Sequence, residues 1–198
     1  MNENIQRYNQ GAKELANKFN SIGSRVDDVK RAFSYILKDK DIKVLELGCG
    51  NGRDAKEILK LTNDYIGIDA SEEMIKLAQQ ALPNANFMVA DMLDYPFPPN
   101  TDIVFAFASL LHFNKQQLEQ MLIKTHQSLV KGGIFYISTK YGRYEQKQKE
   151  DEFGSSVYYL YTIENITELA DDMYEVVYSD TQDIKNNKWL TIVLRKRG

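Results

Sequence analysis

Apolar and polar positions alternate along this chain with two different periods. Over residues 1–40 the apolar side chains recur every three or four positions, a spacing that predicts amphipathic helices. One helical face carries Ile5, Tyr8, Ala12, Leu15, Ala16 and Phe19, and after Gly23 a second carries Val26, Val29, Phe33, Ile36 and Leu37. We expect these residues to form a helical cap on the remainder of the chain.

From residue 42 onward, short apolar runs alternate with helical stretches. The predicted strands cover residues 42–47, 65–68, 87–89, 102–107 and 134–138, and the predicted helices cover 53–61, 72–82, 115–129 and 162–170. The run 102–107 is apolar almost throughout, which is typical of a parallel strand buried on both faces. This alternation predicts an α/β fold, with a parallel sheet covered by helices on both sides.

Two further apolar runs, 174–179 and 189–195, lie close together near the C-terminus and flank a polar turn around Asn186 and Asn187. They predict an antiparallel hairpin. Neither a repeat nor a biased linker divides the chain, so residues 1–198 are predicted to form one domain, with 1–40 as the cap within it. Residues 140–161 carry tyrosines around a charged run, which fits either a lid over a substrate or a solvated loop.

A glycine-rich segment, Gly48-Cys49-Gly50-Asn51-Gly52, directly follows the first predicted strand and precedes a helix. Glycines at alternating positions permit positive φ angles and let a ligand lie against the backbone. The free N–H groups of the following helix point to the same place. The alternative is a tight turn with no ligand. A dinucleotide site would need a glycine where Arg53 stands, so the spacing argues against NAD.

Composition narrows the possible partners. The chain has 198 residues and a net charge of −3, which provides no overall basic surface for a nucleic acid. Its apolar runs fall short of the roughly 18 to 20 residues that span a bilayer. A polar N-terminus and a single cysteine favour a cytoplasmic location without a membrane partner. With one cysteine and two histidines, a metal site is not expected.

Several blocks of the chain resemble the class I S-adenosylmethionine-dependent methyltransferases. Residues 46–52 are similar to the first motif of the family, which wraps the methionine part of the cofactor. Residues 65–69 resemble the second motif, 90–92 the third, 102–112 the fourth and 129–133 the fifth. The resemblance implies a Rossmann-like three-layer sandwich whose seven-stranded, mostly parallel sheet has the order 3-2-1-4-5-7-6 and ends in the antiparallel hairpin.

The resemblance also implies a cofactor site for S-adenosyl-L-methionine. Asp69 would bind the ribose, which agrees with its place at the end of the second strand. Asp91 would accept the adenine amino group, and the Met92 N–H would meet a ring nitrogen. The implied site consists of Tyr8, Glu46, Gly48, Gly50, Asn51, Gly52, Arg53, Asp69, Ala70, Met74, Asp91, Met92, Ala106 and Phe107.

Shorter segments resemble one bacterial subgroup of small methyltransferases. These segments are residues 108–112, residues 138–142 and the pair Trp189-Leu190. The chain departs from the subgroup after the fifth strand, where Ser156-Val157-Tyr158 replaces an Arg-x-Phe element. A substrate role for that element therefore does not carry over to this chain.

Two residues are candidates for the chemistry of methyl transfer. Tyr8 would lie over the cofactor, although its place in an apolar stripe also fits simple packing. His112 follows the fourth strand and could deprotonate a substrate, because its pKa is ordinarily near neutrality. The alternative is a turn residue that orients the helix beginning after Asn114.

These features predict an enzyme that methylates an oxygen, nitrogen or sulfur nucleophile of a small molecule, acting as a monomer or homodimer. A non-catalytic subunit that senses or binds S-adenosylmethionine is the alternative from another class. A third reading is an aminopropyltransferase that prefers the decarboxylated cofactor, although the chain lacks evident acidic substrate-site pairs.

Overall fold

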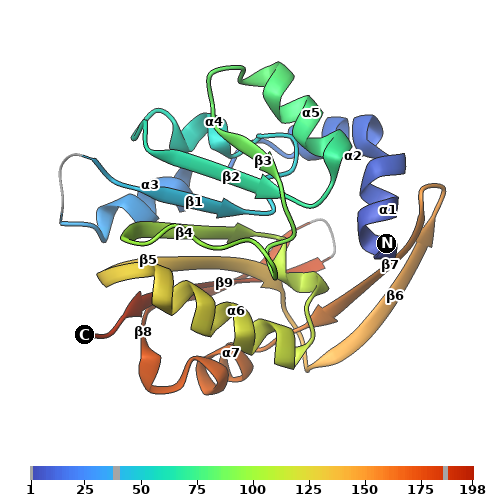
Figure 1. Ribbon diagram of the computed structural model, residues 1–198. Helices are drawn as coiled ribbons and strands as arrows, with labels where there is room; N and C mark the ends of the chain where they lie inside the picture. The colour runs from blue at the N-terminus through green and yellow to red at the C-terminus, as the bar shows by residue number, and fades with distance from the viewer. Residues whose placement is uncertain (1, 38–40, 185–186) are drawn as a thin grey trace.

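The computed structural model describes residues 2–37, 41–184 and 187–198 (Figure 1). The helices are α1 (Glu3–Gln10), α2 (Ala12–Asn20), α3 (Val26–Ser34), α4 (Ala55–Ile58), α5 (Glu72–Ala81), α6 (Lys115–Ser128) and α7 (Ile163–Ala170), with short 3-10 helices η1 (Leu110–His112) and η2 (Asp171–Met173). The strands are β1 (Val44–Leu47), β2 (Tyr65–Asp69), β3 (Phe87–Val89), β4 (Thr101–Phe107), β5 (Leu129–Lys140), β6 (Glu145–Asp151), β7 (Gly154–Leu160), β8 (Tyr174–Ile184) and β9 (Asn187–Lys196).

Seven strands form the main sheet, in the order β3-β2-β1-β4-β5-β9-β8. The first five pair in parallel, whereas β9 runs antiparallel to both β5 and β8. Strands β6 and β7 form a separate two-stranded sheet. When that pair is set aside, the order is the predicted 3-2-1-4-5-7-6, so the Rossmann-like architecture is confirmed. The C-terminal hairpin is longer than predicted, and Asn186 of its predicted turn lies outside the described residues.

Helices cover both faces of the sheet (Figure 1). On one face Val29 of α3, Ile58 of α4 and Ile75 of α5 are buried in a single apolar cluster with the sheet. On the other face Leu122 of α6 and Ile166 of α7 are buried in a second cluster. All seven residues of β4 are buried, as predicted for a central parallel strand. The longest described helix, α6, has 14 residues, and none of the described helices could span a bilayer.

The N-terminal cap consists of three helices. α1 gives way to α2 at Gly11, where an added Cβ would lie 2.5 Å from the ring of Phe153, so only glycine allows this close approach. α3 ends at Ser34, earlier than the apolar spacing predicted. Leu37, which we predicted to face inward, is therefore wholly exposed. The predicted helix 53–61 is likewise shorter, because only Ala55–Ile58 form α4.

Strands β6 and β7 make up most of the segment that the sequence assigned to a lid or a solvated loop. Its charged run is regular structure: β6 pairs with β7 from Glu145↔Leu160 to Asp151↔Gly154. In Figure 1 this hairpin stands away from the main sheet and runs beside α1. Most β6 side chains are exposed, so the strand lacks the alternation of a half-buried strand, and sequence analysis found no strand here.

Candidate active site

The glycine-rich turn lies at the carboxyl end of β1, and all three of its glycines have positive φ angles: +72° at Gly48, +54° at Gly50 and +76° at Gly52. An added Cβ on Gly48 would lie 2.4 Å from Ser109, and one on Gly52 would lie 3.2 Å from Phe87. An added Cβ on Gly50 would meet nothing within 4 Å. Gly48 and Gly52 are thus required by packing, whereas Gly50 presents bare backbone to open space, where a ligand could lie.

Asp69, the last residue of β2, is fastened to this turn. Its Oδ2 accepts a hydrogen bond from the Gly50 N–H at 2.9 Å, and its Oδ1 accepts one from the Ser71 N–H at 2.8 Å. Burial raises the pKa of the Asp69 carboxyl. Each carboxylate oxygen has two lone pairs, so both can accept a further hydrogen bond. The carboxylate therefore suits the pair of hydroxyls on a ribose.

The second half of the turn is attached to the N-terminal cap. The Asn51 Nδ2 donates to Asn20 Oδ1 at 2.9 Å. The Arg53 guanidinium pairs with the buried Asp54 carboxylate at 2.5 Å, and Asp54 Oδ1 accepts from the Arg25 N–H at 2.9 Å. The side chains of Asn51 and Arg53, predicted as cofactor ligands, thus have protein partners here. Their side-chain contacts fix the shape of the turn.

Glu46 lies on β1, just before the glycine turn. Its carboxyl is buried and accepts a hydrogen bond from the Tyr65 hydroxyl at 2.5 Å. Burial, with a smaller contribution from the nearby Asp54 carboxylate, raises the pKa of Glu46 to about 8. A carboxyl with this pKa is largely protonated at neutral pH. Its hydrogen bond from Tyr65 joins the side chains of β1 and β2.

Tyr8 and His112, the two predicted catalytic residues, are in contact. The Tyr8 hydroxyl lies 3.2 Å from His112 Nε2, and the rings meet edge to face at 5.8 Å. His112 Nδ1 lies 2.7 Å from the Val157 carbonyl oxygen. A carbonyl only accepts, so Nδ1 must carry the hydrogen and Nε2 must accept from Tyr8.

Burial keeps both members of this pair neutral. It lowers the pKa of His112, while the bond to the Val157 carbonyl opposes that shift. It also raises the pKa of Tyr8 to about 12. The site therefore holds a neutral imidazole whose Nε2 lone pair points toward a neutral phenol, which is the protonation state of a general base before reaction.

Helix α1 ties the pair to the rest of the site. Asn4 bonds to Val157 of β7 in both directions, from Nδ2 to the carbonyl at 3.2 Å and from the Val157 N–H to Oδ1 at 2.9 Å. Arg7 forms an ion pair with Asp151 of β6. At the other side of the helix, Asn9 Oδ1 accepts from the Ser71 hydroxyl at 2.7 Å. Sequence analysis missed these polar residues because a polar residue on a helix carries no signal of its distant partner.

The other predicted cofactor residues follow the ends of neighbouring strands. Asp91 follows β3, and its Oδ1 accepts a hydrogen bond from the Leu93 N–H at 2.9 Å. The Met92 carbonyl accepts a hydrogen bond from Lys124 Nζ at 2.9 Å. Ala106 and Phe107 are buried at the end of β4. Ala70 is half-buried after β2, and Met74 is buried in the first turn of α5. The carboxyl ends of parallel strands lie at the same end of the sheet, so these residues lie near one another there.

Three of the four buried side-chain hydroxyls without a hydrogen-bond partner in the described part of the chain lie at or near the carboxyl ends of β4 and β5. Within the described part of the chain, they include Ser109 Oγ after β4 and Ser138 Oγ and Thr139 Oγ1 near the end of β5. Buried polar atoms are normally paired, so such atoms indicate a place where a ligand or water would bind. Together with the open backbone at Gly50 and the acceptors on Asp69, they fit a polar nucleoside cofactor and a neighbouring substrate.

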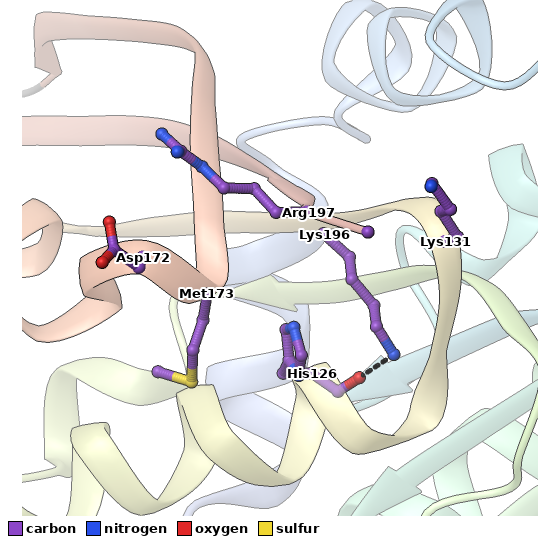
Figure 2. A pocket seen from close by; sticks show the side chains of 7 residues that line it. His126, Lys131, Asp172, Met173, Lys196 and Arg197 are labelled. Atoms are coloured by element: carbon purple, nitrogen blue, oxygen red, sulfur yellow. Dashed lines mark hydrogen bonds between the residues drawn. The ribbon is translucent and has the colours of Figure 1, made fainter.

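A hollow at the opposite edge of the sheet is unrelated to this arrangement. Figure 2 shows its lining, which includes His126, Met173 and Lys196. Lys196 Nζ donates to the His126 carbonyl at 2.7 Å and to the Leu129 carbonyl at 2.8 Å, so its charge caps the end of α6. Leu129 begins β5, which places this hollow at the amino end of that strand, away from the glycine turn.

Comparison with known proteins agrees with the geometry. Residues 44–133 match the family described as "Methyltransferase domain". An uncharacterized methyltransferase of Oceanobacillus iheyensis is 25% identical over 156 residues, which cover 77% of this chain and 70% of the relative. A trans-aconitate 2-methyltransferase of Acidovorax is 38% identical over 69 residues, but the match covers only 34% of this chain and 27% of that protein.

Solved structures share the fold over most of the chain. The 1,6-didemethyltoxoflavin-N1-methyltransferase of Burkholderia thailandensis, with bound 1,6-didemethyltoxoflavin and S-adenosylhomocysteine, has a TM-score of 0.75 at 17% identity, and the match covers 98% of this chain and 88% of that protein. An S-adenosylmethionine-dependent methyltransferase of Clostridium acetobutylicum has a TM-score of 0.72 at 14% identity, covering 93% and 100%. These likenesses show that residues 44–133 carry a methyltransferase domain and that the chain has the fold of the class I S-adenosylmethionine-dependent methyltransferases. The cofactor of this class is S-adenosylmethionine.

Proposed function

We propose that the protein transfers the methyl group of S-adenosylmethionine to an oxygen, nitrogen or sulfur nucleophile of a small molecule. The observation that carries this proposal is the neutral Tyr8–His112 pair. His112 Nε2 is held at 3.2 Å from the Tyr8 hydroxyl by a fixed tautomer, at the edge where the glycine turn and Asp69 lie. A non-catalytic binding subunit would have no need of an oriented base.

The residues of this edge suit the cofactor. Asp69 would bind the ribose hydroxyls, Asp91 and the Met92 N–H would bind the adenine, and Gly50 would allow the methionine part to lie on the backbone. When bound, the cofactor supplies an electrophilic methyl group on a sulfonium. The chain then has to orient the acceptor in line with that methyl group and exclude water.

His112 would take up the proton that the nucleophile releases. In the structure the Tyr8 hydroxyl occupies the lone pair of His112 Nε2, so it would have to give way before a substrate N–H, O–H or S–H group could donate its proton there. The bound cofactor would supply the methyl group, and its sulfur would keep the electron pair of the broken carbon–sulfur bond. The Val157 carbonyl keeps Nδ1 protonated and stabilises the imidazolium that results.

Two observations support a small-molecule acceptor. α1 and the β6–β7 hairpin both contact His112, through Tyr8 and the Val157 carbonyl, and so cover part of its ring. The net charge of −3 also disfavours a nucleic acid. We extend the proposal to a cytoplasmic monomer or homodimer that acts without a membrane partner.

Calorimetry and a turnover assay test the proposal in two stages. We expect S-adenosylhomocysteine to bind to both the wild-type protein and His112→Gln with similar affinity. Wild-type protein should release S-adenosylhomocysteine from S-adenosylmethionine with acceptors from a panel of small hydroxy acids, amines, phenols and thiols, and the variant should be at least about 100-fold slower. Failure to bind either cofactor form would refute the proposal, and binding without turnover across broad panels would favour a sensor subunit.

A further inference from the structure

Lys140, the last residue of β5, carries a charge that the described part of the chain does not neutralise. Its Nζ donates to the Asn187 side chain at 2.8 Å, and none of the described carboxylates forms an ion pair with it. The side chain is half-buried, and burial together with the nearby Lys149 ammonium lowers the pKa of Lys140. Partial removal from water and a like charge both oppose the ammonium, and a bound anion would offset both.

Two aromatic rings fix the position of this ammonium. Its Nζ lies 4.6 Å from the centre of the Tyr158 ring of β7 and 5.8 Å from that of the Trp189 ring of β9. Trp189 is the partner of Lys140 in the β5–β9 register, so both side chains lie on one face of the sheet. The Arg25 guanidinium also approaches the Trp189 ring, at 5.9 Å. The ring contacts therefore restrict the ammonium, while the charges around Trp189 are positive.

A buried hydroxyl lies on the same face of β5. Ser138 is two residues before Lys140, a spacing that places both side chains on one side of a strand. The Ser138 side chain is 1% exposed, and its Oγ has no hydrogen-bond partner in the described part of the chain. Ser138 is also in register with Phe107, at the carboxyl end of β4. A hydroxyl and a cation thus follow one another along β5 to the edge of the sheet where the glycine turn lies.

Strand β7 connects this cation to the Tyr8–His112 pair. Tyr158, whose ring contacts the ammonium, directly follows Val157, whose carbonyl oxygen lies 2.7 Å from His112 Nδ1. Consecutive residues of a strand are only about 3.3 Å apart along its axis. The ammonium and the base therefore meet β7 at neighbouring residues, so one small molecule could contact both.

We propose that Lys140 binds a carboxylate on the acceptor, so that the substrate of this enzyme is a small acid. The proposal rests on the proposed function and names the class of its substrate. An ammonium has three donors, of which Asn187 takes one, and the remainder suits the single charge of a carboxylate. A phosphate dianion would require more positive charge than one lysine supplies. The carboxylate holds the acceptor, while a separate O–H, N–H or S–H group of the same molecule faces His112.

Calorimetry with paired ligands tests the proposal. The ligands are small hydroxy acids, amino acids, phenolic acids and thiol acids, each paired with its neutral carboxamide and titrated into protein saturated with S-adenosylhomocysteine. In the wild type we expect the tightest-binding acid to bind about 10- to 100-fold more tightly than its amide. Lys140→Met should weaken that acid to the level of its amide. The affinities for the amide and for S-adenosylhomocysteine should change less than about threefold.

Lys188→Met is the matched control. The Lys188 Nζ also lies over a tyrosine ring, 4.7 Å from the centre of Tyr141. Because Lys188 is adjacent to Trp189 in β9, its side chain lies on the opposite face of the sheet. Its substitution removes one positive charge and one ring contact, and it should change none of these affinities.

The other outcomes overturn the proposal. If no acid of the panel binds the wild type more tightly than its amide, the substrate is not held by a carboxylate, whether or not Lys140→Met folds. Tighter binding of matching phosphate esters would make this a phosphate site. Equal weakening of acid and amide, or a loss of S-adenosylhomocysteine affinity, would make Lys140 a structural support. If the wild type does not bind S-adenosylhomocysteine, the proposed function itself fails, whereas binding without a preference for acids refutes only the acidic substrate.

Discussion

Glu46 couples the stability of the protein to pH through its buried carboxyl. The carboxyl accepts a hydrogen bond from the Tyr65 hydroxyl at 2.5 Å. Burial raises the pKa of Glu46 from 4.5 to about 8. Glu46→Gln replaces the carboxyl with a neutral group of the same shape that still accepts the Tyr65 hydrogen bond. The substitution therefore removes the titration while keeping the packing.

The sign and size of the effect follow from linkage. Below pH 4.5 the carboxyl is protonated in both the folded and unfolded states and carries no penalty. As pH rises from 4.5 to about 8, the unfolded chain releases the proton while the folded protein retains it, so the free energy of unfolding falls. A tenfold change in proton affinity is worth about 1.4 kcal/mol, which bounds the whole effect at about 5 kcal/mol. Dielectric relaxation reduces this, and we expect about 2 to 3 kcal/mol between pH 5 and pH 8.

Urea unfolding at pH 5, 6, 7 and 8 measures this difference. Glu46→Gln should become more stable than the wild type as pH rises, and the gap should grow by about 2 to 3 kcal/mol over the series. Glu119→Gln, which changes an exposed glutamate on α6, gives the background. A gap between Glu46→Gln and the wild type that stays constant across these pH values would show that Glu46 ionises normally in the folded protein.

Three further predictions concern the site and its cover. Asp69→Ala should weaken S-adenosylhomocysteine binding by about 1 to 3 kcal/mol in calorimetry, because it removes charge-assisted hydrogen bonds; an unchanged affinity would exclude the ribose assignment. Burial lowers the pKa of His112, so the acid limb of the kcat/KM profile should fall below pH 6.5 and vanish in His112→Gln; a limb that persists in the variant belongs to another group. Asp151→Asn breaks the ion pair with Arg7 and should speed amide hydrogen exchange over residues 145–160, with the main sheet unchanged; equal protection in both proteins would show that this pair does not hold the hairpin.

Local patterns were sufficient to predict the main sheet and the glycine turn. Strand β4 is buried along its whole length because it lies in the centre of the sheet, and its run of apolar residues predicted this burial. Glycines at alternating positions predicted backbone with positive φ angles, and Gly48 and Gly50 have them. Asp69 could be placed beside them because parallel strands end at one edge, and its bond to the Gly50 N–H at 2.9 Å confirms that placement.

Contacts between distant segments could not be predicted. Asn4 and Val157 are 153 residues apart, and nothing in either segment alone identifies the other. The strand β6 exposes most of its charged side chains, so its pairing with β7 leaves no alternation of apolar residues. Arg53, assigned to the cofactor site from its position in the motif, is paired with Asp54, a contact that the motif does not predict. Its place in the cofactor site stays a prediction.

The proton-accepting geometry depends on these distant contacts. His112 takes its tautomer from the Val157 carbonyl of β7, and its Nε2 meets the Tyr8 hydroxyl of α1. α1 is in turn fastened to Ser71, at the start of α5, through Asn9. The base is therefore oriented only while α1, the hairpin and the start of α5 are docked together. Because Ser71 also donates its N–H to Asp69, the same contacts reach the carboxylate that we propose binds the ribose, so we expect cofactor binding and the orientation of His112 to depend on each other.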